Sequence, residues 1–259
     1  MVIRRIREHV ASHNWFAVGV DLAIVVVGVF LGTQANNWNE ARLAASEEHT
    51  YRERLIEDVA ANQFDFQARK AYYGDVRRHA LAALQMFDSS KTKLGESFVV
   101  DAYQASQINA LILRRSTYDE LVASGALSRI GNQHLRDLAE TYYQGLTVLV
   151  AENQRLPPYR ERVRRELPYQ VSSRIRERCG DRVSEMRGTI IFRLPGDCKL
   201  SLDERSVERA AVQLRAAPEL DRDLSRYILD IDQRLDNFAG SERRSRLFVA
   251  ALRQANAKR

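Results

Sequence analysis

The sequence predicts a mainly α-helical protein, with one N-terminal transmembrane helix that continues into an antiparallel helical bundle. Three observations support this fold class. Residues 16–33 are almost uniformly apolar, glycine (12) and proline (5) are scarce among 259 residues, and apolar residues recur at helical spacing beyond the apolar run. Hydrophobic residues make up 45% of the chain, which is enough to bury a core, so wholesale disorder is not expected.

The apolar run 16–33 contains one ionisable residue, Asp21. Eighteen helical residues rise about 27 Å, which is close to the hydrocarbon thickness of a bilayer. Trp15 and Trp38 lie just beyond the two ends of the run, and tryptophan rings prefer the headgroup level. We therefore predict a transmembrane helix over residues 15–35.

Basic residues predict the orientation of this helix. Arginines precede it at positions 4, 5 and 7, whereas Arg42 is the only basic residue among the first dozen that follow. By the positive-inside rule, residues 1–14 form a cytoplasmic tail and residues 36–259 form an extracytoplasmic bundle domain. The expected location is a bacterial inner membrane, crossed once, with the C-terminal domain in the periplasm.

A cleaved signal peptide is the alternative interpretation of the same region. It would have the same basic start, and Thr33-Gln34-Ala35 weakly resembles a small-x-small cleavage site. Asp21 within the apolar run and the length of the run both favour an uncleaved anchor. A buried core helix is a further alternative, which the charge asymmetry and the flanking tryptophans disfavour.

Three residues of the predicted span share one helix face. Gly28 and Gly32 have small-xxx-small spacing, which lets two helix backbones approach closely. Asp21 lies seven residues before Gly28, so its carboxylate falls on nearly the same face. We expect this face to pack against another helix, in a homodimer or a larger complex. The alternative is that glycine is common in membrane helices and that Asp21 is an acid tolerated near the interface.

Two segments carry a resemblance to a known family. Residues 21–42 combine an acidic residue, a Val/Ile/Gly-rich run and a polar exit made of Gln34, Asn36, Asn37, Trp38, Asn39 and Glu40. The second segment contains Tyr118, Glu120, Leu121, Gly125, Asn132, Leu135, Tyr142 and Tyr143. Together they resemble an uncharacterised bacterial family of single-span membrane proteins, a domain of unknown function. The resemblance implies topology and fold but no reaction, and it does not cover the cysteines or the C-terminal helix.

Helix-breaking residues predict where the helices begin and end. No glycine or proline lies between Gly32 and Gly74, so the membrane helix is expected to continue to about Phe87. Pro168 is expected to kink one later helix. Further helices are expected at about 98–114, 133–155, 159–178, 203–216 and 218–254.

Capping residues define a short helix in the family-like segment. Thr117 and Glu120 have the spacing of a capping box, and Gly125 is a natural left-handed C-cap. Asn132 is then expected to cap the helix that follows. An apolar stripe in the last helix is interpreted as bundle core; its members are Leu220, Leu224, Tyr227, Ile228, Ile231, Leu235 and Phe238.

Cys179 and Cys198 are the only cysteines, and both lie in the predicted exported domain. A disulfide is expected, because thiols in exported domains are oxidised. The two α-carbons would then lie within about 7 Å of each other. Two unrelated buried thiols are the alternative, and metal binding is disfavoured because no histidine is near. Between the cysteines, Thr189 to Leu194 is the best strand candidate, so a small irregular or β segment is expected near residues 180–200.

The sequence contains no motif for chemistry. The five histidines are scattered, and there is no metal-ligand pair, phosphate-binding loop or nucleophile elbow. No catalytic, cofactor or metal residue is therefore predicted. Tyr118, Asp119, Tyr142 and Tyr143 either line a polar site or serve as packing with hydroxyls at the rim. The net charge of +6 is spread among interleaved acids, so nucleic acid is not expected as a partner.

These observations favour a membrane-anchored periplasmic interaction or scaffold module, with membrane lipid and a protein partner or a second copy as its contacts. The alternative is a ligand-sensing helical domain that signals through a partner chain. A periplasmic enzyme is a third class, without specific support in the sequence.

Overall fold

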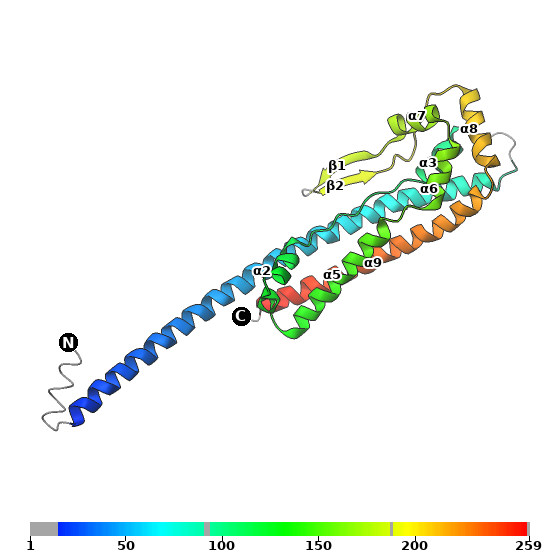
Figure 1. Ribbon diagram of the computed structural model, residues 1–259. Coiled ribbons are helices and arrows are strands. Elements are labelled where there is room, and N and C mark those ends of the chain that lie inside the picture. The colour runs from blue at the N-terminus through cyan, green and yellow to red at the C-terminus, as the bar shows by residue number, and fades with distance from the viewer. Residues whose placement is uncertain (1–14, 91–93, 187–188, 258–259) are drawn as a thin grey trace. The chain divides into compact units, whose positions relative to one another are not determined.

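The computed structural model of the protein describes residues 15–90, 94–186 and 189–257 (Figure 1). The described chain is mainly α-helical, with one small two-stranded antiparallel sheet. It divides into two compact units, Met1–Tyr51 and Arg52–Arg259. The division falls within a helix, about fifteen residues later than the domain boundary at residue 36 that the sequence suggested.

The longest helix is α2, Trp15–Phe87, and it is continuous, as predicted. Its N-terminal part is long and apolar enough to cross a membrane. In the first unit its apolar side chains, such as Phe16 (82% exposed) and Phe30 (58% exposed), have no protein core to cover them. This exposure is what a lipid-facing helix requires, because lipid and not protein then covers the apolar surface.

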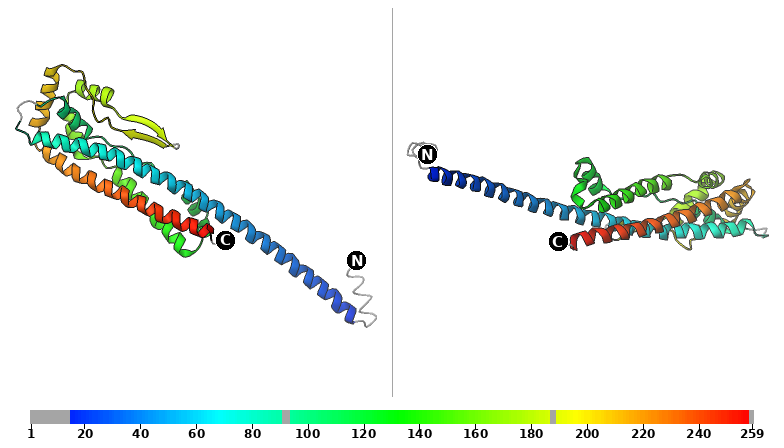
Figure 2. Two further views of the ribbon diagram at one scale, coloured as in Figure 1. Left: turned by 180° about the vertical axis from the view of Figure 1, so that it is seen from behind. Right: turned by 90° about the horizontal axis from the view of Figure 1, so that it is seen from below.

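In the second unit, the rest of α2 lies beside α9, Leu220–Ala257, and α5, Gln133–Asn153 (Figures 1 and 2). The pairing of α2 with α9 is antiparallel, since Arg52 Nε donates to Asn256 Oδ1 while Arg77 pairs with Asp232. The three helices form a core that is rich in aromatic rings. Six of the seven residues predicted for the α9 core stripe are buried, and Leu235 is half-buried.

Shorter helices surround this core: α3 (Glu96–Gln104), α4 (Ser116–Ala123), η1 (Ala126–Ile130), α6 (Pro158–Glu166), α7 (Tyr169–Cys179) and α8 (Glu204–Ala216). Their ends follow from local chemistry. Pro158 opens α6, and the Asp203 carboxylate accepts from the Ser206 amide at 2.9 Å to cap α8. The prediction that Asn132 caps α5 is confirmed, because its side chain accepts from the Leu135 amide at 3.1 Å.

The predicted helix over residues 98–114 is wrong beyond Gln104. There α3 ends, and residues 107–115 run in a non-helical path along α2, which we call the extended segment. The Asn62 side chain explains the change. Its Oδ1 accepts from the Arg114 amide at 2.7 Å, and its Nδ2 donates to the Arg114 carbonyl at 2.8 Å. A distant side chain thus replaces helical partners, which local periodicity does not reveal.

The predicted kink at Pro168 is a complete break between α6 and α7. Leu167 and Pro168 both have extended backbone, with ψ of 131° and 142°. A residue before proline is sterically pushed out of the helical region, and Pro168 has no amide to continue the ladder. Proline at the junction therefore separates two helices that sequence periodicity had joined.

The predicted capping box at Thr117 is also wrong. Helix α4 already includes Ser116, and the Thr117 amide is bound by Asp58 Oδ2 of α2 at 3.3 Å. Glu120 pairs with Arg54 instead of turning back to the helix start. The other end is as predicted: Gly125 follows α4 with φ of +68°, a left-handed conformation that glycine adopts without strain.

The sheet is a hairpin of β1 (Arg182–Met186) and β2 (Thr189–Arg193). Its register places Arg182 opposite Arg193 and Met186 opposite Thr189. The strand candidate near 189–194 is confirmed, whereas β1 was not predicted, because its residues are all exposed and carry no apolar alternation. A two-stranded sheet leaves one edge of each strand unpaired.

Candidate functional site

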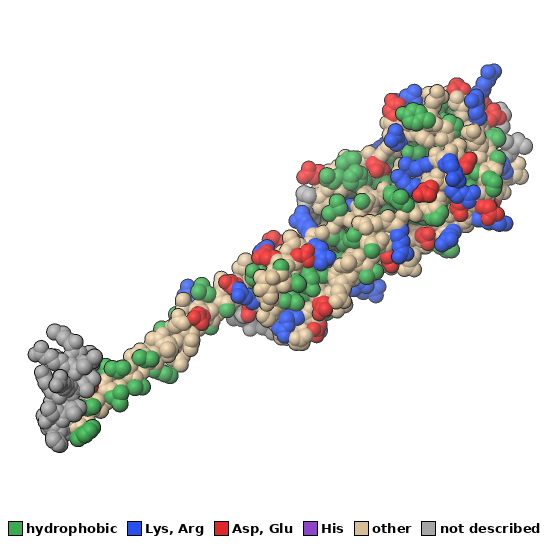
Figure 3. Space-filling view, in the orientation of Figure 1, with side chains coloured by type: hydrophobic (Ala, Val, Ile, Leu, Met, Phe, Trp, Pro, Cys, Tyr) green, Lys and Arg blue, Asp and Glu red, His purple; other side chains and the backbone are tan. Residues whose placement is uncertain are grey.

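A cleft of about 490 Å³ lies between β2, α2 and the extended segment, all in the second unit; we call it the hairpin cleft. Its lining residues are Ala61, Asn62, Asp65, Arg69, Asn109, Ala110, Ile112, Leu113, Arg114, Thr189, Ile190 and Phe192. Hydrophobic side chains gather on the surface around the hairpin (Figure 3). The cleft therefore combines a polar helix surface with apolar walls, which is the usual composition of a binding site.

The α2 side of the cleft carries a buried ion pair, Asp65 with Arg69. Two guanidinium nitrogens lie 3.3 and 3.4 Å from the two carboxylate oxygens, and Arg69 also contacts Asn109 Oδ1. Burial raises the pKa of the Asp65 carboxyl, an effect that the charge of Arg69 and its hydrogen bond only partly offset. Most of the Asp65 carboxylate's surface is thus withdrawn from water, at the edge of a cleft that a ligand can enter.

A buried polar network connects the cleft to the bundle core. The Tyr73 hydroxyl accepts from Arg234 Nη1 at 3.0 Å and from the Asn109 amide at 3.3 Å. Asn153 of α5 donates through Nδ2 to the Asn109 carbonyl at 3.0 Å. Since Asn109 also contacts Arg69, one residue of the extended segment joins the cleft to α2, α5 and α9.

The walls of the cleft expose backbone as well as apolar side chains. Ile112 is 82% exposed and Ile190 is 55% exposed. Among the described residues, the four consecutive amides from Ala110 to Leu113 have no hydrogen-bond acceptor, while β2 pairs only with β1. The extended segment and β2, which both line the cleft, therefore carry unpaired backbone groups.

The hairpin is fixed to α2 by charged contacts near its base. Arg193 Nε and Nη2 lie 2.7 and 3.1 Å from the two carboxylate oxygens of Asp75, and Arg78 binds the same group. Burial by itself would raise the pKa of Asp75, but the hydrogen bonds from Arg193 and Arg78 outweigh it and lower that pKa. Tyr72 adds a hydrogen bond to Asp181, just before β1.

Cys179 and Cys198 lie at disulfide distance, with α-carbons 5.6 Å apart, which satisfies the geometric condition set by the sequence prediction. Cys179 ends α7, where Gln104 Nε2 donates to its carbonyl at 2.5 Å. The bridge joins two residues that are 19 positions apart, and the loop that it closes contains the whole hairpin. The covalent closure and the Arg193–Asp75 contact together hold the hairpin beside the cleft.

The residues predicted to mediate membrane-helix contact lie in the first unit. Gly28 and Gly32 have open space where a Cβ would stand, and Asp21 is half-buried. These facts are compatible with lipid or with a second helix as neighbour, so the association remains a prediction. The exit motif is helical and exposed from Gln34 to Glu40, and the Asn36 side chain donates to Glu40 at 2.7 Å.

The second family-like segment serves packing in the second unit. Tyr142, Tyr143, Leu121 and Leu135 are buried, and Tyr118 stacks on Tyr143 with ring centroids 4.2 Å apart. Burial raises the pKa of the Tyr143 hydroxyl, which keeps it neutral. None of these residues lines the hairpin cleft.

Sequence reasoning missed the cleft residues Asp65, Arg69 and Asn109. A signal for two of them was present: on α2, Asn62, Asp65 and Arg69 recur at helical spacing beside the apolar positions Phe66 and Tyr73. Polar residues in a core-facing stripe indicate a buried network. The role of Asn109 depends on the extended segment, which the sequence had suggested to be helical.

Among the residues that the structure describes, no group of three or more His, Cys, Asp or Glu side chains could hold a metal ion. Comparison with known proteins found no matching family model, no matching curated protein and no matching solved structure.

Proposed function

We propose that this protein is an interaction module anchored in a bacterial inner membrane, whose hairpin cleft accepts an extended segment of a partner polypeptide. The observation that carries the proposal is that two elements lining the cleft, β2 and the extended segment, carry unpaired backbone groups. A peptide strand supplies backbone acceptors and donors along its length, which is what the unpaired groups at Ala110–Leu113 and on β2 require.

The side chains of the cleft suit such a partner. Ile112, Ile190 and Phe192 offer apolar contacts for alternate residues of a strand. Asn62 already binds the backbone of Arg114 in the pattern that a strand neighbour uses. We therefore expect a partner segment in which apolar residues alternate with polar ones.

The location is part of the proposal. The arginines before the span support a cytoplasmic N-terminus, and the paired cysteines support an oxidising compartment for the second unit. The resemblance of residues 21–42 and 116–143 to the single-span family supports the same topology. A reporter that is active only outside the cytoplasm, fused after Arg259, is expected to work; activity from a cytoplasmic reporter alone would reverse the orientation.

The cleft is tested by peptide selection on the purified full chain in a mild detergent. Selected peptides are resynthesised with single N-methyl groups along the backbone. Strand pairing with both walls predicts that a methyl group on any amide within the bound stretch weakens binding, since alternate amides of a strand point to opposite edges and each edge faces one wall. Methyl groups on the flanking residues should be tolerated, and tolerance at every position contradicts strand addition.

Matched substitutions locate the binding. Ile112→Asp with Ile190→Asp places charges on both walls at exposed positions, so folding is little affected while peptide affinity falls at least about tenfold. Leu229→Asp is the control, because Leu229 is 69% exposed on α9 and does not line the cleft. Equal affinity of the cleft variant and the control refutes the hairpin cleft as the site.

One observation favours a second candidate, the ligand-sensing domain. The Asp65–Arg69 pair is connected to the core helices through Asn109 and Tyr73. A small molecule that displaces either charge would therefore change the hydrogen bonds that reach α5 and α9. A bound small molecule that co-purifies and is lost on Arg69→Met would favour this function over peptide binding.

A further inference from the structure

Seven arginines are concentrated in α6 and α7, and they divide into two groups by their partners. Three of them pair with carboxylates: Arg162 with Asp223, Arg165 with Glu166 and Arg174 with Glu177. Among the described residues, the other four have no carboxylate partner: Arg178 contacts Ser201 Oγ at 3.3 Å, and the remaining three are Arg160, Arg164 and Arg176. Lys and Arg side chains gather on this part of the surface, with acids among them (Figure 3).

Two of these arginines, Arg160 and Arg164, contact Ser106, where α3 gives way to the extended segment, and Arg176 is near enough for its charge to act on Arg164. Arg160 Nη1 donates to the Ser106 carbonyl, and Arg164 Nε lies 3.2 Å from Ser106 Oγ. Arg164 also donates to Gln107 Oε1 at 3.0 Å and lies over the Tyr103 ring, 4.7 Å from its centroid. Neutral oxygens and an aromatic face thus hold these guanidinium groups in place without neutralising them.

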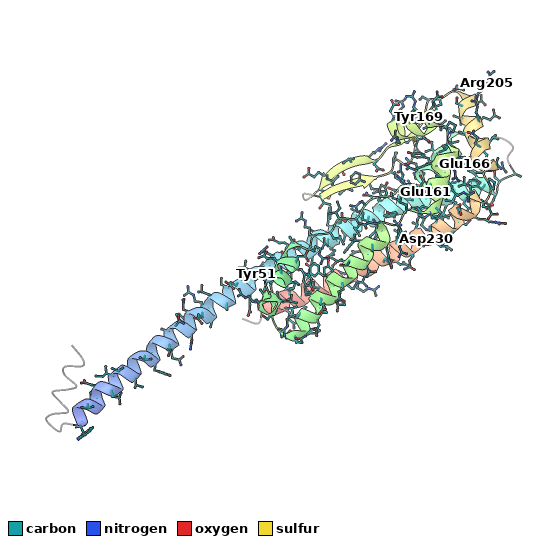
Figure 4. The ribbon with its side chains drawn as sticks, viewed as in Figure 1. Tyr51, Glu161, Glu166, Tyr169, Arg205 and Asp230 are labelled. Atoms are coloured by element: carbon teal, nitrogen blue, oxygen red, sulfur yellow. A yellow bond between two sulfur atoms is a disulfide. The ribbon has the colours of Figure 1, made fainter. Side chains whose placement is uncertain are left out.

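The charges around Arg164 also indicate an excess of positive charge in the cluster. Burial lowers the pKa of the Arg164 guanidinium, and the nearby charges of Arg160 and Arg176 lower it further. The acids on the same helix do not compensate. Glu161 and Glu166 project from α6 (Figure 4), and Glu166 pairs with Arg165, while among the described residues Glu161 forms no ion pair with Arg164. The cluster therefore holds excess positive charge in a half-buried position.

The hydrogen-bonding capacity of the cluster is unfilled. Each guanidinium has five N–H donors in a planar fork, and the contacts above use one on Arg160 and two on Arg164. Such forks match tetrahedral oxyanions, since two N–H groups can bind two oxygens of one phosphate.

We propose that Arg160, Arg164 and Arg176 form a binding site for a phosphate group, independent of the hairpin cleft. Arg160 and Arg164 bind phosphate oxygens directly, and Arg176, which is exposed, closes over the bound group. The group belongs either to a free phosphate monoester or to the phosphodiester of a lipid headgroup, which share the same oxygen chemistry.

The test uses the full chain in an uncharged detergent, with binding measured by titration calorimetry at constant ionic strength. Inorganic phosphate and glycerol phosphate represent monoesters, and glycerophosphoglycerol represents a lipid headgroup diester. Saturable binding of the monoesters alone assigns a soluble ligand, whereas tighter binding of the diester assigns a lipid. No saturation by any of the three probes overturns the proposal.

Variants separate a site from general charge attraction. Arg160→Gln with Arg164→Gln is expected to weaken phosphate binding at least about tenfold, because charge-assisted hydrogen bonds are lost. Arg165→Gln with Arg174→Gln removes the same charge from paired arginines and should change affinity less than about twofold. Equal weakening by both pairs refutes a specific site. If the first pair fails to fold, Arg176→Gln alone, at an exposed position, should still weaken binding, and unchanged binding refutes the site.

Discussion

Helix α2 has two chemically different parts, one in each unit. Over residues 16–33, in the first unit, it is apolar except at Asp21, and its large side chains are exposed. In the second unit it is amphipathic, and its buried face includes charged and polar residues such as Asn62, Asp65 and Arg69. One continuous helix thus combines a part suited to lipid with a part suited to a protein core, and among its described residues only the second part buries polar groups.

The largest expected effect on stability comes from truncating a buried phenylalanine of α2, with an exposed phenylalanine of the same helix as the comparison. Phe66 is fully buried against Phe238, with ring centroids 6.3 Å apart, whereas Phe30 is 58% exposed. Phe66→Ala should lower the free energy of unfolding of the second unit by about 3–5 kcal/mol, while Phe30→Ala should leave it unchanged.

The aromatic residues make this comparison measurable in the full chain. Both tryptophans, Trp15 and Trp38, lie in the first unit, and nine of the ten tyrosines lie after Tyr51. Near-ultraviolet circular dichroism of tyrosine, followed during urea unfolding in detergent, therefore reports the second unit, and tryptophan fluorescence reports the first. Equal shifts for the two alanine variants would contradict the proposed difference between the two parts.

The next largest effect is expected from the disulfide, which belongs to the second unit alone. Replacing Cys179 and Cys198 by alanine should lower the free energy of unfolding by about 3 kcal/mol, as expected for a closed loop of this length. Reduction of the unaltered chain should reproduce the shift. If the variant and the reduced protein unfold at the same urea concentration as the oxidised protein, the bridge does not stabilise the unit.

A smaller, pH-dependent effect distinguishes two buried acids on α2. The pKa of Asp75 is lowered in the folded state, so its stabilising contribution is present above the unfolded pKa, about 4, and is lost as pH falls through the folded pKa. The pKa of Asp65 is raised, so protonation favours folding, and its contribution is lost as pH rises through the folded pKa.

The opposite pH dependences of the two contributions to stability are checked by urea unfolding between about pH 3 and pH 7. The stability advantage of the unaltered chain over Asp75→Asn should be about 1 kcal/mol at neutral pH, because Arg193 is half-exposed and water screens the pair, and it should shrink in acid. The comparison with Asp65→Asn should show the opposite trend. Parallel pH profiles of the two variants would refute the assignment.

The smallest effect on folding is expected in the span. Gly28→Leu with Gly32→Leu should not change the unfolding of the second unit, but it should weaken self-association in a membrane two-hybrid assay. Gly19→Leu is the matched control, because Gly19 lies nine residues before Gly28 and so on the opposite helix face. If the double variant associates like the parent, lipid rather than a second helix covers this face.

The sequence predicted features that depend on neighbouring residues. The unbroken α2, the Asn132 cap, the Gly125 turn and the α9 core stripe all follow from spacing or from conformational preference. Features that depend on distant partners were missed. The extended segment exists because Asn62 and Tyr73 of α2 bind its backbone, and the hairpin cleft depends on that segment. Local patterns cannot reveal such contacts, which join residues far apart in the chain.

The antiparallel pairing of α2 with α9 has a consequence for biosynthesis. Arg52 and its partner Asn256 are separated by 204 residues. At about 5–20 residues per second, a ribosome needs about 10–40 s to make the intervening chain. During that interval the core face of α2 has emerged without α9, so we expect chains truncated before α9 to be cleaved by proteases faster than the full chain.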